Sequence, residues 1–454
     1  MPAPDSSATA ETAAETAAES AAETAAAAGG DVAERIATRR SRAGRLARGT
    51  VIDLSPLRHA DFRRLWIGNS VAFIGFAVTA VAVPVQVYDI TGSSFWVGLL
   101  GAVGFLPLVV FGLWGGAIAD AADRRVLLIS SSLVLWGCTL ALLLQALAGL
   151  RSLALLLVLV AVQSGAFAVA SSTRGAVVPR VLPASEVASA NTLNFTASTI
   201  ASAAGPLLAG ALVGRGWFAV AYGVDAALFT LALYAALRLP ALPPLTEGEA
   251  PAQRQVPGLR SVVEGLAFIS KSPVLLLSFA VDIAAMFFAL PRALFPQAAA
   301  ERFGGGVGWL FAAIAIGSSL AGLSSGWIRR VRHQGVALVV AVLVWGAAVA
   351  VSGLARNLAA AVVLLAVAGA ADLVSAVYRQ TILQTYAPDE MRGRLQGVFV
   401  VVVAGGPRLG DLRAGATAAA YGLTASWVGG GIACVIVVLP ALFVPALRHY
   451  TSRT

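Results

Sequence analysis

The sequence predicts an all-α integral membrane protein with twelve transmembrane helices, arranged as two parallel repeats of six. Of the 454 residues, 58% are hydrophobic and 12% are charged, whereas soluble proteins are about 45 to 50% apolar and about 25% charged. Apolar runs of about 20 residues, enough to cross a bilayer, recur from Phe62 onward between short charged or Gly/Pro-containing breaks. Several patterns of the first half also return in the second at an offset of about 205 residues.

The expected spans form two sets of six along the chain. The first set covers roughly residues 63–87, 95–119, 126–148, 152–173, 187–213 and 217–238, and the second covers 274–298, 306–328, 335–354, 358–379, 395–421 and 424–447. Five segments follow from this division: a disordered Ala/Glu/Thr-rich and basic tail over 1–61, a six-helix bundle over 62–238, a linker with an amphipathic helix over 239–273, a second bundle over 274–447, and a tail over 448–454.

The basic residues give the expected orientation. An N-terminus in the cytoplasm places 25 of the 32 basic residues in inner segments, 4 in outer loops and 3 within spans, as the positive-inside rule requires. An even number of spans returns the C-terminus to the same side. We therefore predict a multi-pass protein of the bacterial cytoplasmic membrane with both termini inside, and we interpret the net charge of +9 as an orientation signal and not as a nucleic-acid surface.

An internal repeat relates the two sets of spans. Because each half contains an even number of spans, both copies enter the membrane from the same side and are related by an axis along the membrane normal. Such halves enclose a cavity near the bilayer midplane and expose it to one side at a time. The matching positions are Pro84 with Pro291, Gly116 to Arg124 with Gly322 to Arg330, Arg174 and Pro183 with Arg379 and Pro388, and Gly205 and Pro206 with Gly406 and Pro407.

The segment GGAIADAADRR after the second span resembles the signature loop of the major facilitator superfamily, through Gly116, Asp120, Arg124 and Arg125. It departs from that pattern at Ala121, where a basic residue is usual, and at Asp123, where glycine is usual. The resemblance implies that this loop gates the inner side; the alternative is that its two arginines serve orientation alone. Asp120 is expected to face a helix dipole across the seam between the halves.

In the fifth span, AAGPLLAGALVG resembles the Gly-Pro motif of antiporters in the same superfamily, through Gly205, Pro206 and Gly210. Small residues there let a neighbouring backbone approach closely. The stretches SFWVGLLG, ADAADRR and FALPRALFP are most similar to twelve-span drug and siderophore exporters of the enterobactin-exporter and macrolide-efflux type. The arginine that many antiporters carry in the fourth span is absent from LVLVAVQSGAF, so proton coupling, if present, must use other groups.

Charged residues inside the expected spans are the candidate coupling and cavity groups. Asp282 and Asp372 each cost about 2.5 to 3.5 kcal/mol if they face lipid, so each should face a cavity or a partner. Asp372 shares a helix face with Ser375 and Arg379 and could instead be a paired structural acid. Arg292 could meet an anionic substrate or an acid. Arg408 and Asp411 could neutralise one another or reach the second span. Arg413 could extend toward the membrane surface, and Asp225 is expected to be structural.

The remaining polar and aromatic residues of the cavity-lining spans favour a bulky amphipathic substrate over a sugar, because sugars need many hydrogen-bonding side chains. We therefore predict a proton-coupled exporter of small amphipathic molecules, such as a drug, a siderophore or a similar metabolite, acting as a monomer. An organic-solute importer and a non-transporting sensor or scaffold remain alternatives. No enzyme, cofactor, metal or nucleotide site is predicted. The substrate-cavity candidates are Asn69, Gln86, Gln163, Phe287 and Tyr378.

Overall fold

In the computed structural model, which describes residues 53–121, 123–240, 259–386, 388, 391–448 and 450, every regular element is a helix. The first set comprises α2 (Ala60–Thr91), α3 (Ser94–Ala121), α4 (Arg124–Leu147), α5 (Leu153–Val181), α6 (Val187–Val213) and α7 (Phe218–Leu237). The second comprises α9 (Pro273–Ala289), η3 (Arg292–Leu294), α10 (Phe295–Glu301), α11 (Val307–Leu323), α12 (Gln334–Ser352), α13 (Leu358–Tyr386), α14 (Arg392–Tyr421) and α15 (Leu423–Val438). Smaller elements are η1 (Ser55–Arg58), η2 (Ala184–Glu186), α8 (Leu259–Lys271), η4 (Ser325–Arg330), η6 (Leu439–Phe443) and α16 (Pro445–Arg448).

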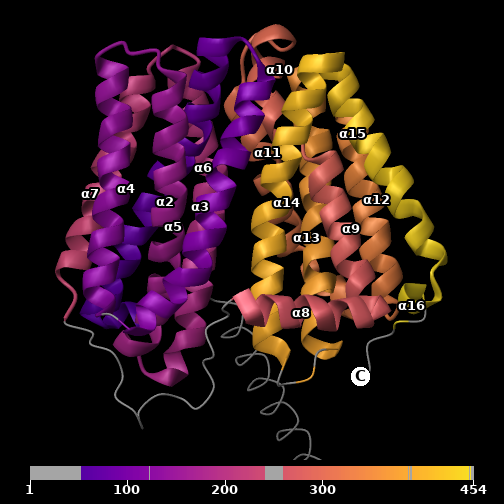
Figure 1. Cartoon of the computed structure of the whole chain (residues 1–454), viewed down its shortest axis with the longest axis horizontal. Helices are drawn as coiled ribbons and strands as arrows, with labels where there is room; N and C mark the ends of the chain where they lie inside the picture. The colour runs from indigo at the N-terminus through magenta and orange to yellow at the C-terminus, as the bar shows by residue number, and fades with distance from the viewer. Residues whose placement is uncertain are drawn as a thin grey trace, which may run out of the picture. The chain divides into compact units, whose positions relative to one another are not determined.

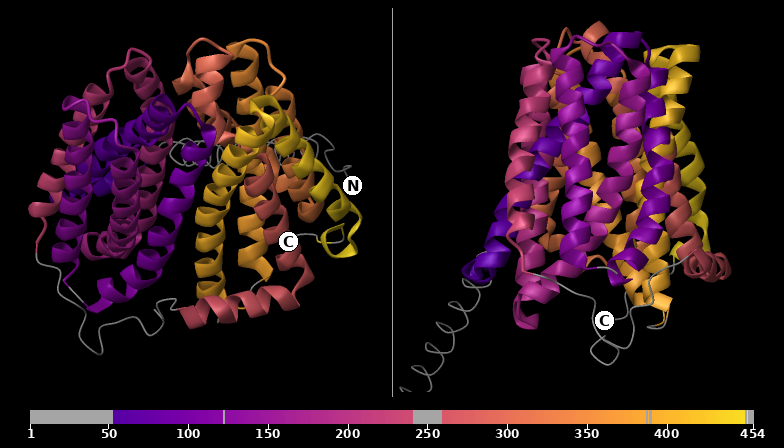
Figure 2. Two further views of the ribbon diagram at one scale, coloured as in Figure 1. Left: turned by 45° about the horizontal axis from the view of Figure 1, so that its top comes forward. Right: turned by 60° about the vertical axis from the view of Figure 1, so that its left-hand side comes forward.

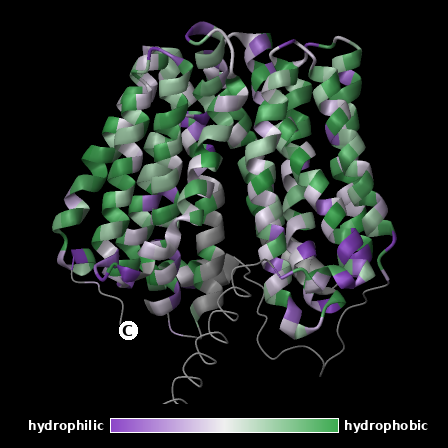
Figure 3. Ribbon diagram, turned by 180° about the vertical axis from the view of Figure 1, so that it is seen from behind, coloured by the Kyte–Doolittle hydropathy of each residue, from purple (hydrophilic) through white to green (hydrophobic). Residues whose placement is uncertain are grey.

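The all-α membrane fold is confirmed. Within the described residues, ten helical segments are long and apolar enough to cross a membrane. Figure 3 shows the hydrophobic colour along the helices and the hydrophilic colour mainly near their ends. α11 is apolar but has only 17 residues. α14 has 30 residues, but it carries Arg408, Asp411 and Arg413 in its middle. The count of twelve spans therefore stays a prediction for these two helices.

The two sets of helices use the same pairings. In the first set α2 packs on α6 and α7, α4 packs on α5 and α7, and α3 packs on α5. In the second set α9 packs on α14 and α15, α12 packs on α13 and α15, and α11 packs on α13. Each pair of the first set has its counterpart six spans later. Both sets belong to one compact unit, Pro56–Thr454, and Figure 1 shows them side by side.

Two opposite faces of the bundle are distinguished by short elements. α8 packs against α9 and α14 and lies across the helix ends on the face that we call the linker face. α10 lies at the other end, on the face that we call the α10 face; Figure 2 shows both from two further directions. α8 covers the segment in which the sequence predicted an amphipathic helix.

Short polar residues begin several of the helices. Asp123 caps α4 by accepting a hydrogen bond from the Arg125 amide at 2.8 Å, and Ser152 and Ser272 cap α5 and α9 in the same way. A side-chain oxygen at this position satisfies an amide that the helix leaves unpaired. The departure from the superfamily loop at Asp123 thus supplies a helix cap, which glycine lacks.

The expected seventh span, 274–298, is not one continuous helix. α9 ends at Ala289, Leu290 is extended, and the chain continues through η3 into α10. Pro291 explains the break, since proline has no amide hydrogen and disfavours a helical conformation in the residue before it. Its repeat partner Pro84 instead lies inside the unbroken α2.

Candidate functional site

Two adjoining cavities lie between the two sets of helices. The central cavity, of about 700 Å³, is walled mainly by α2 and α6 of the first set and by α9, α11, α13 and α14 of the second. The side pocket, of about 380 Å³, extends toward α3 and shares Phe76, Phe167 and Arg292 with the central cavity. Ligand pockets have volumes of about 300 to 1,000 Å³, so these cavities are large enough for a small organic molecule.

The two sets meet on the α10 side of these cavities at two helix crossings. Where α6 crosses α11, a Cβ added at Gly210 would lie 2.6 Å from the backbone of Gly308. Where α14 crosses α3, the backbone of Asp411 leaves no room for a Cβ at Gly98. Glycine at these positions lets the backbones approach closely. The cavities therefore lie on the linker-face side of a tightly packed seam.

A third cavity, of about 270 Å³, is lined by the first turns of α2, including Asn69, and by the last turns of α5 near Arg174. Both segments lie at the linker-face ends of their helices. Arg174 has its guanidinium 5.8 Å from the centre of the Phe73 ring, and Phe73 also lines the central cavity. The hollow space between the helices thus continues from the central cavity toward the linker face.

A polar chain joins the two sets at the α10 face, and we call it the α10 latch. Tyr88 of α2 donates a hydrogen bond of 2.5 Å to Glu301 of α10. Gln297 donates to the other carboxylate oxygen of Glu301 at 3.0 Å and accepts from Ser94 of α3 at 2.8 Å. Because two residues of the first set are held by two residues of the second, the α10 latch resists separation of the sets at this face.

The central cavity contains a buried ion pair between α9 and α13. Asp282 lies 2.5 Å from Arg379, and their side chains are 3% and 5% exposed. Asp372, on the same helix as Arg379, is attracted to that arginine and repelled by Asp282. All three residues line the cavity. The structure therefore brings both predicted carboxylates together around one guanidinium.

Arg379 is a member of the site that the sequence analysis named only as a neighbour of Asp372 on the same helix face. It stands at the last position of the expected span over 358–379, whereas α13 continues to Tyr386 and Arg379 is 4% exposed. The expected pairing along the Asp372 face was incomplete, because Ser375 donates to the backbone oxygen of Asp372, and the ion pair of Arg379 crosses to Asp282 on another helix. The repeat with Arg174, which also lines a cavity, was the signal that could have identified it.

A second charged cluster lies where the side pocket meets the seam. Asp411 is attracted to both Arg292 and Arg408 and accepts a hydrogen bond from the backbone amide of Ala293. Arg408 is 3.5 Å from the hydroxyl of Ser164. The expected pairing of Arg408 with Asp411 within α14 is thus one part of a larger cluster that also includes the broken seventh span.

Arg413 has a different environment from the one expected. It does not extend toward the membrane surface; its guanidinium donates to the backbone oxygens of Phe287 at 3.1 Å and of Phe288 at 2.5 Å. These carbonyls belong to the last turn of α9, where no further helical amides are available to bind them. Arg413 therefore caps the end of the broken span.

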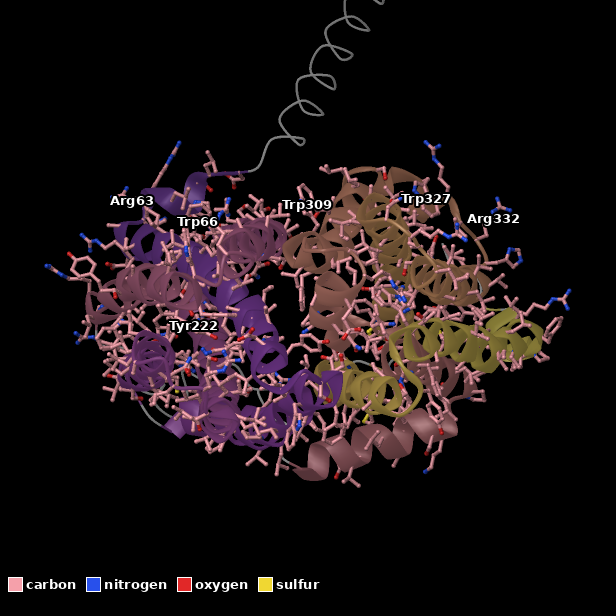
Figure 4. The ribbon with its side chains drawn as sticks, turned by 90° about the horizontal axis from the view of Figure 1, so that it is seen from above. Arg63, Trp66, Tyr222, Trp309, Trp327 and Arg332 are labelled. Carbon is pink, nitrogen blue, oxygen red and sulfur yellow. The ribbon has the colours of Figure 1, made fainter. Side chains whose placement is uncertain are left out.

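The substrate-cavity candidates divide into two groups. Asn69 and Gln163 line the third cavity and the side pocket. Gln86 instead bonds to Gln145 and Tyr222 inside the first set, and Figure 4 shows Tyr222 within that set, away from its border with the second.

The other two candidates also lie in packing contacts. Tyr378 is 1% exposed and contacts the Ile328 carbonyl, and Phe287 packs edge-on against Phe288. The cavities also contain a stacked pair of rings outside these candidates: Phe76 and Phe167 have ring centroids 5.1 Å apart.

The residues of the two superfamily-like motifs lie at the end of α3, at the start of α4 and in α6. Gly116 and Asp120 lie in the last turns of α3, outside the side chains that the structure describes. Arg124 is buried, and Arg125 donates to the Leu237 carbonyl at the end of α7 within its own set. In α6, Gly205 packs on Ala77 of α2, Pro206 lines the central cavity, and Gly210 contacts α11 of the other set.

Comparison with known proteins agrees with this architecture. Residues 51–452 match a family described as transmembrane secretion effector. The chain is 29% identical to the enterobactin exporter EntS of Escherichia coli (strain K12) over 413 residues, 88% of this chain and 96% of that protein. Among solved structures, it resembles the nucleoside transporter NupG with a TM-score of 0.68 at 14% identity, over 86% of this chain and 100% of that chain.

It also resembles a bacterial homolog of the human lysosomal transporter Spinster in an inward-facing, unoccupied conformation, with a TM-score of 0.64 at 18% identity over 87% of this chain and 97% of that chain. These two structural likenesses concern the fold alone. The family match covers all of the helical region described above, from Ser55 to Arg448. The chain therefore belongs to the transmembrane secretion effector family of the major facilitator superfamily, and it is a membrane transporter.

Proposed function

We propose that this protein is a proton-coupled exporter of small amphipathic molecules in a bacterial cytoplasmic membrane. The linker face is the cytoplasmic face, and the α10 face is the outer one. The observation that carries the proposal is the arrangement of Asp282, Arg379 and Asp372 on the wall of one cavity. A carboxylate in such a position can take up a proton from one side of the membrane and release it to the other.

The ion pair provides the coupling step. While Asp282 is ionised, it holds Arg379 and joins α9 to α13. Protonation of Asp282 removes its charge, and Arg379 is then stabilised mainly by Asp372, which lies on its own helix. Protonation therefore replaces a bond between helices with an interaction within one helix. This change loosens α9 relative to α13 and favours rearrangement of the halves.

Alternating access needs a seam that can open on either side. The crossings of α6 with α11 and of α3 with α14 close the α10 side, together with the α10 latch. In the state described here, a substrate enters from the linker face. Opening of the crossings and the latch releases it at the α10 face, and a proton then enters from outside to neutralise Asp282. Export of the substrate is thus exchanged for inward movement of a proton.

The direction of transport is supported by the similarity to the enterobactin exporter. The amphipathic character of the substrate is supported by the cavity lining, where phenylalanines of α2, α5 and α11 lie beside the charged groups. An aromatic wall stabilises the apolar part of a ligand, while a few polar groups orient it.

The test is transport in proteoliposomes under an imposed pH gradient, with a panel of drugs and siderophores as substrates. Wild-type protein should move at least one of them faster when the compartment receiving substrate is acidic. Asp282→Asn should lose this gradient dependence, because the asparagine cannot exchange a proton. Wild-type transport that ignores the gradient would refute proton coupling.

Asp225→Asn is the matched control. Asp225 is also a buried carboxylate, 1% exposed, but it bonds to Thr79 and Thr139 within the first set and does not line the central cavity. Gradient-dependent transport should therefore persist in Asp225→Asn. If both variants lose it equally, the loss reflects damage to the fold and not removal of the coupling group.

A further inference from the structure

The wall shared by the central cavity and the side pocket carries an excess of positive charge. Arg292 lines both cavities and Arg408 lines the side pocket. One carboxylate, Asp411, is attracted to both of these arginines. Two guanidinium groups therefore face one acid at this end, whereas two carboxylates face Arg379 at the other.

Asp411 is held in a fixed place and is not free to follow a moving arginine. It is 8% exposed and accepts a hydrogen bond from the Ala293 amide. Its backbone packs against Gly98 of α3. Asp411 can therefore offset one of the two positive charges, and the other has no second counter-charge at this wall among the residues that the structure describes.

Arg292 is the group on which this remaining charge is accessible. It is exposed although it lies between the two sets of helices. Among the residues that the structure describes, it makes no hydrogen bond and no ion pair within 4.0 Å. An arginine at membrane depth is costly and is found where it meets water, a partner or a ligand. Its five N–H donors are suited to a carboxylate, which they bind through two parallel hydrogen bonds.

Aromatic side chains surround the same position. Phe76, Phe167 and Phe311 line both the central cavity and the side pocket, as Arg292 does. A ligand with an acidic group at Arg292 would therefore place its apolar part against these rings. Rings contribute large apolar contact areas, so charge and shape at this wall favour the same kind of molecule.

We propose that Arg292 and Arg408 form an anion-binding site, and that the substrate is an amphipathic organic anion with an acidic group bound there and an aromatic or apolar part against the phenylalanine wall. This inference rests on the proposed function, because it names the substrate class of the same transporter. It assigns the two ends of the charged lining separate tasks: Asp282 exchanges the proton beside Arg379 and Asp372, and Arg292 and Arg408 hold the substrate.

The test measures binding by calorimetry on protein in lipid nanodiscs without any pH gradient. Three probes share one ring system and differ in the charge of the head group: anthracene-9-carboxylate, its carboxamide and 9-(aminomethyl)anthracene. Wild-type protein should prefer the carboxylate. Arg292→Gln should weaken binding of the carboxylate by about 10-fold, the lower range for a charge-assisted hydrogen bond, and leave the carboxamide unchanged.

Two further variants make the result specific. Arg292→Lys keeps the charge and should retain part of the preference, although it loses the two-pronged geometry. Arg356→Gln removes an exposed arginine from the connection between α12 and α13 and should bind all three probes as the wild type does. If Arg292→Gln does not fold, the head-group preferences of the wild type and of Arg292→Lys still test the anion site.

Equal binding of the three probes, no binding of the carboxylate, or preference for the amine would each overturn the anion site. These outcomes are independent of proton coupling, because no gradient is present. An arginine-dependent carboxylate preference in a protein whose transport ignores pH would leave the anion site standing and refute the proton mechanism. Gradient-driven transport of neutral or cationic molecules alone would support the proton mechanism and refute the anion site.

Discussion

The pairing of Asp282 with Arg379 makes a quantitative prediction about stability. Removal of one partner from an ion pair enclosed by protein destabilises a fold by about 3 to 5 kcal/mol, because the other charge stays buried. Here the two groups are 2.5 Å apart and at most 5% exposed, but they border a cavity of about 700 Å³. Water in that cavity reduces the cost of the charge left behind, so we expect Asp282→Asn to lower the free energy of unfolding by about 2 kcal/mol.

The counterpart Arg379→Gln should lower the free energy of unfolding by less, about 1 kcal/mol, since a carboxylate left behind can take up a proton and lose its charge. If the pair interacts as described, the double variant Asp282→Asn/Arg379→Gln should be more stable than the sum of the single effects allows. We expect an interaction energy of about 1 to 2 kcal/mol, well above the 0.3 to 0.5 kcal/mol expected for independent sites.

The assay is thermal unfolding in lipid nanodiscs for the four members of the cycle. For a chain of this length, about 2 kcal/mol corresponds to a fall in the unfolding midpoint of about 2 °C. The exposed pair of Arg151 and Asp89, 3.1 Å apart with side chains 63% and 51% exposed, is the control cycle and should show coupling below about 1 kcal/mol. Additive effects at Asp282 and Arg379 would refute the reasoning.

Three other predictions concern the seam and the broken span. Glu301→Gln weakens the charge-assisted hydrogen bond that residue 301 accepts from Tyr88. It should shift the population toward a state open at the α10 face by about 1 kcal/mol, or about fivefold. An unchanged distance between spin labels on the loops of that face would contradict this. Gly210→Val places a Cβ against Gly308 and should cost about 1 to 3 kcal/mol of closed-state stability, seen as a larger shift with the same labels; a seam that still closes would argue against the crossing. Arg413→Met removes two hydrogen bonds to the end of α9 and should lower the unfolding midpoint by the equivalent of about 1.5 to 3 kcal/mol, whereas an unchanged midpoint would show that these bonds contribute nothing.

The class of the protein and its internal repeat could be predicted from composition and pattern. Apolar runs of about 20 residues have one stable solution in a bilayer, because a helix satisfies its own backbone hydrogen bonds. Such a requirement is local and needs no knowledge of neighbours. The order of matching prolines, glycines and arginines predicted two equivalent sets, and both sets use the same helix pairings. The membrane cost of a charge likewise indicated that Asp282 and Asp372 needed a cavity or a partner, and both line one.

Only the tertiary structure decided which partners those residues have. The position of a residue on a helix follows from its spacing, but the side chain that it meets depends on how that helix is rotated and where its neighbour crosses. Arg379 therefore pairs with Asp282, nearly a hundred residues away in the chain. Gln86 forms its hydrogen bonds inside the first set and not in the cavity. Arg413 caps the end of α9, and that this helix ends there was not predicted from the sequence. Pairing between distant segments is a property of the packed bundle, which is why the proposals for Arg292 with Arg408 and for Asp282 with Arg379 come from the structure.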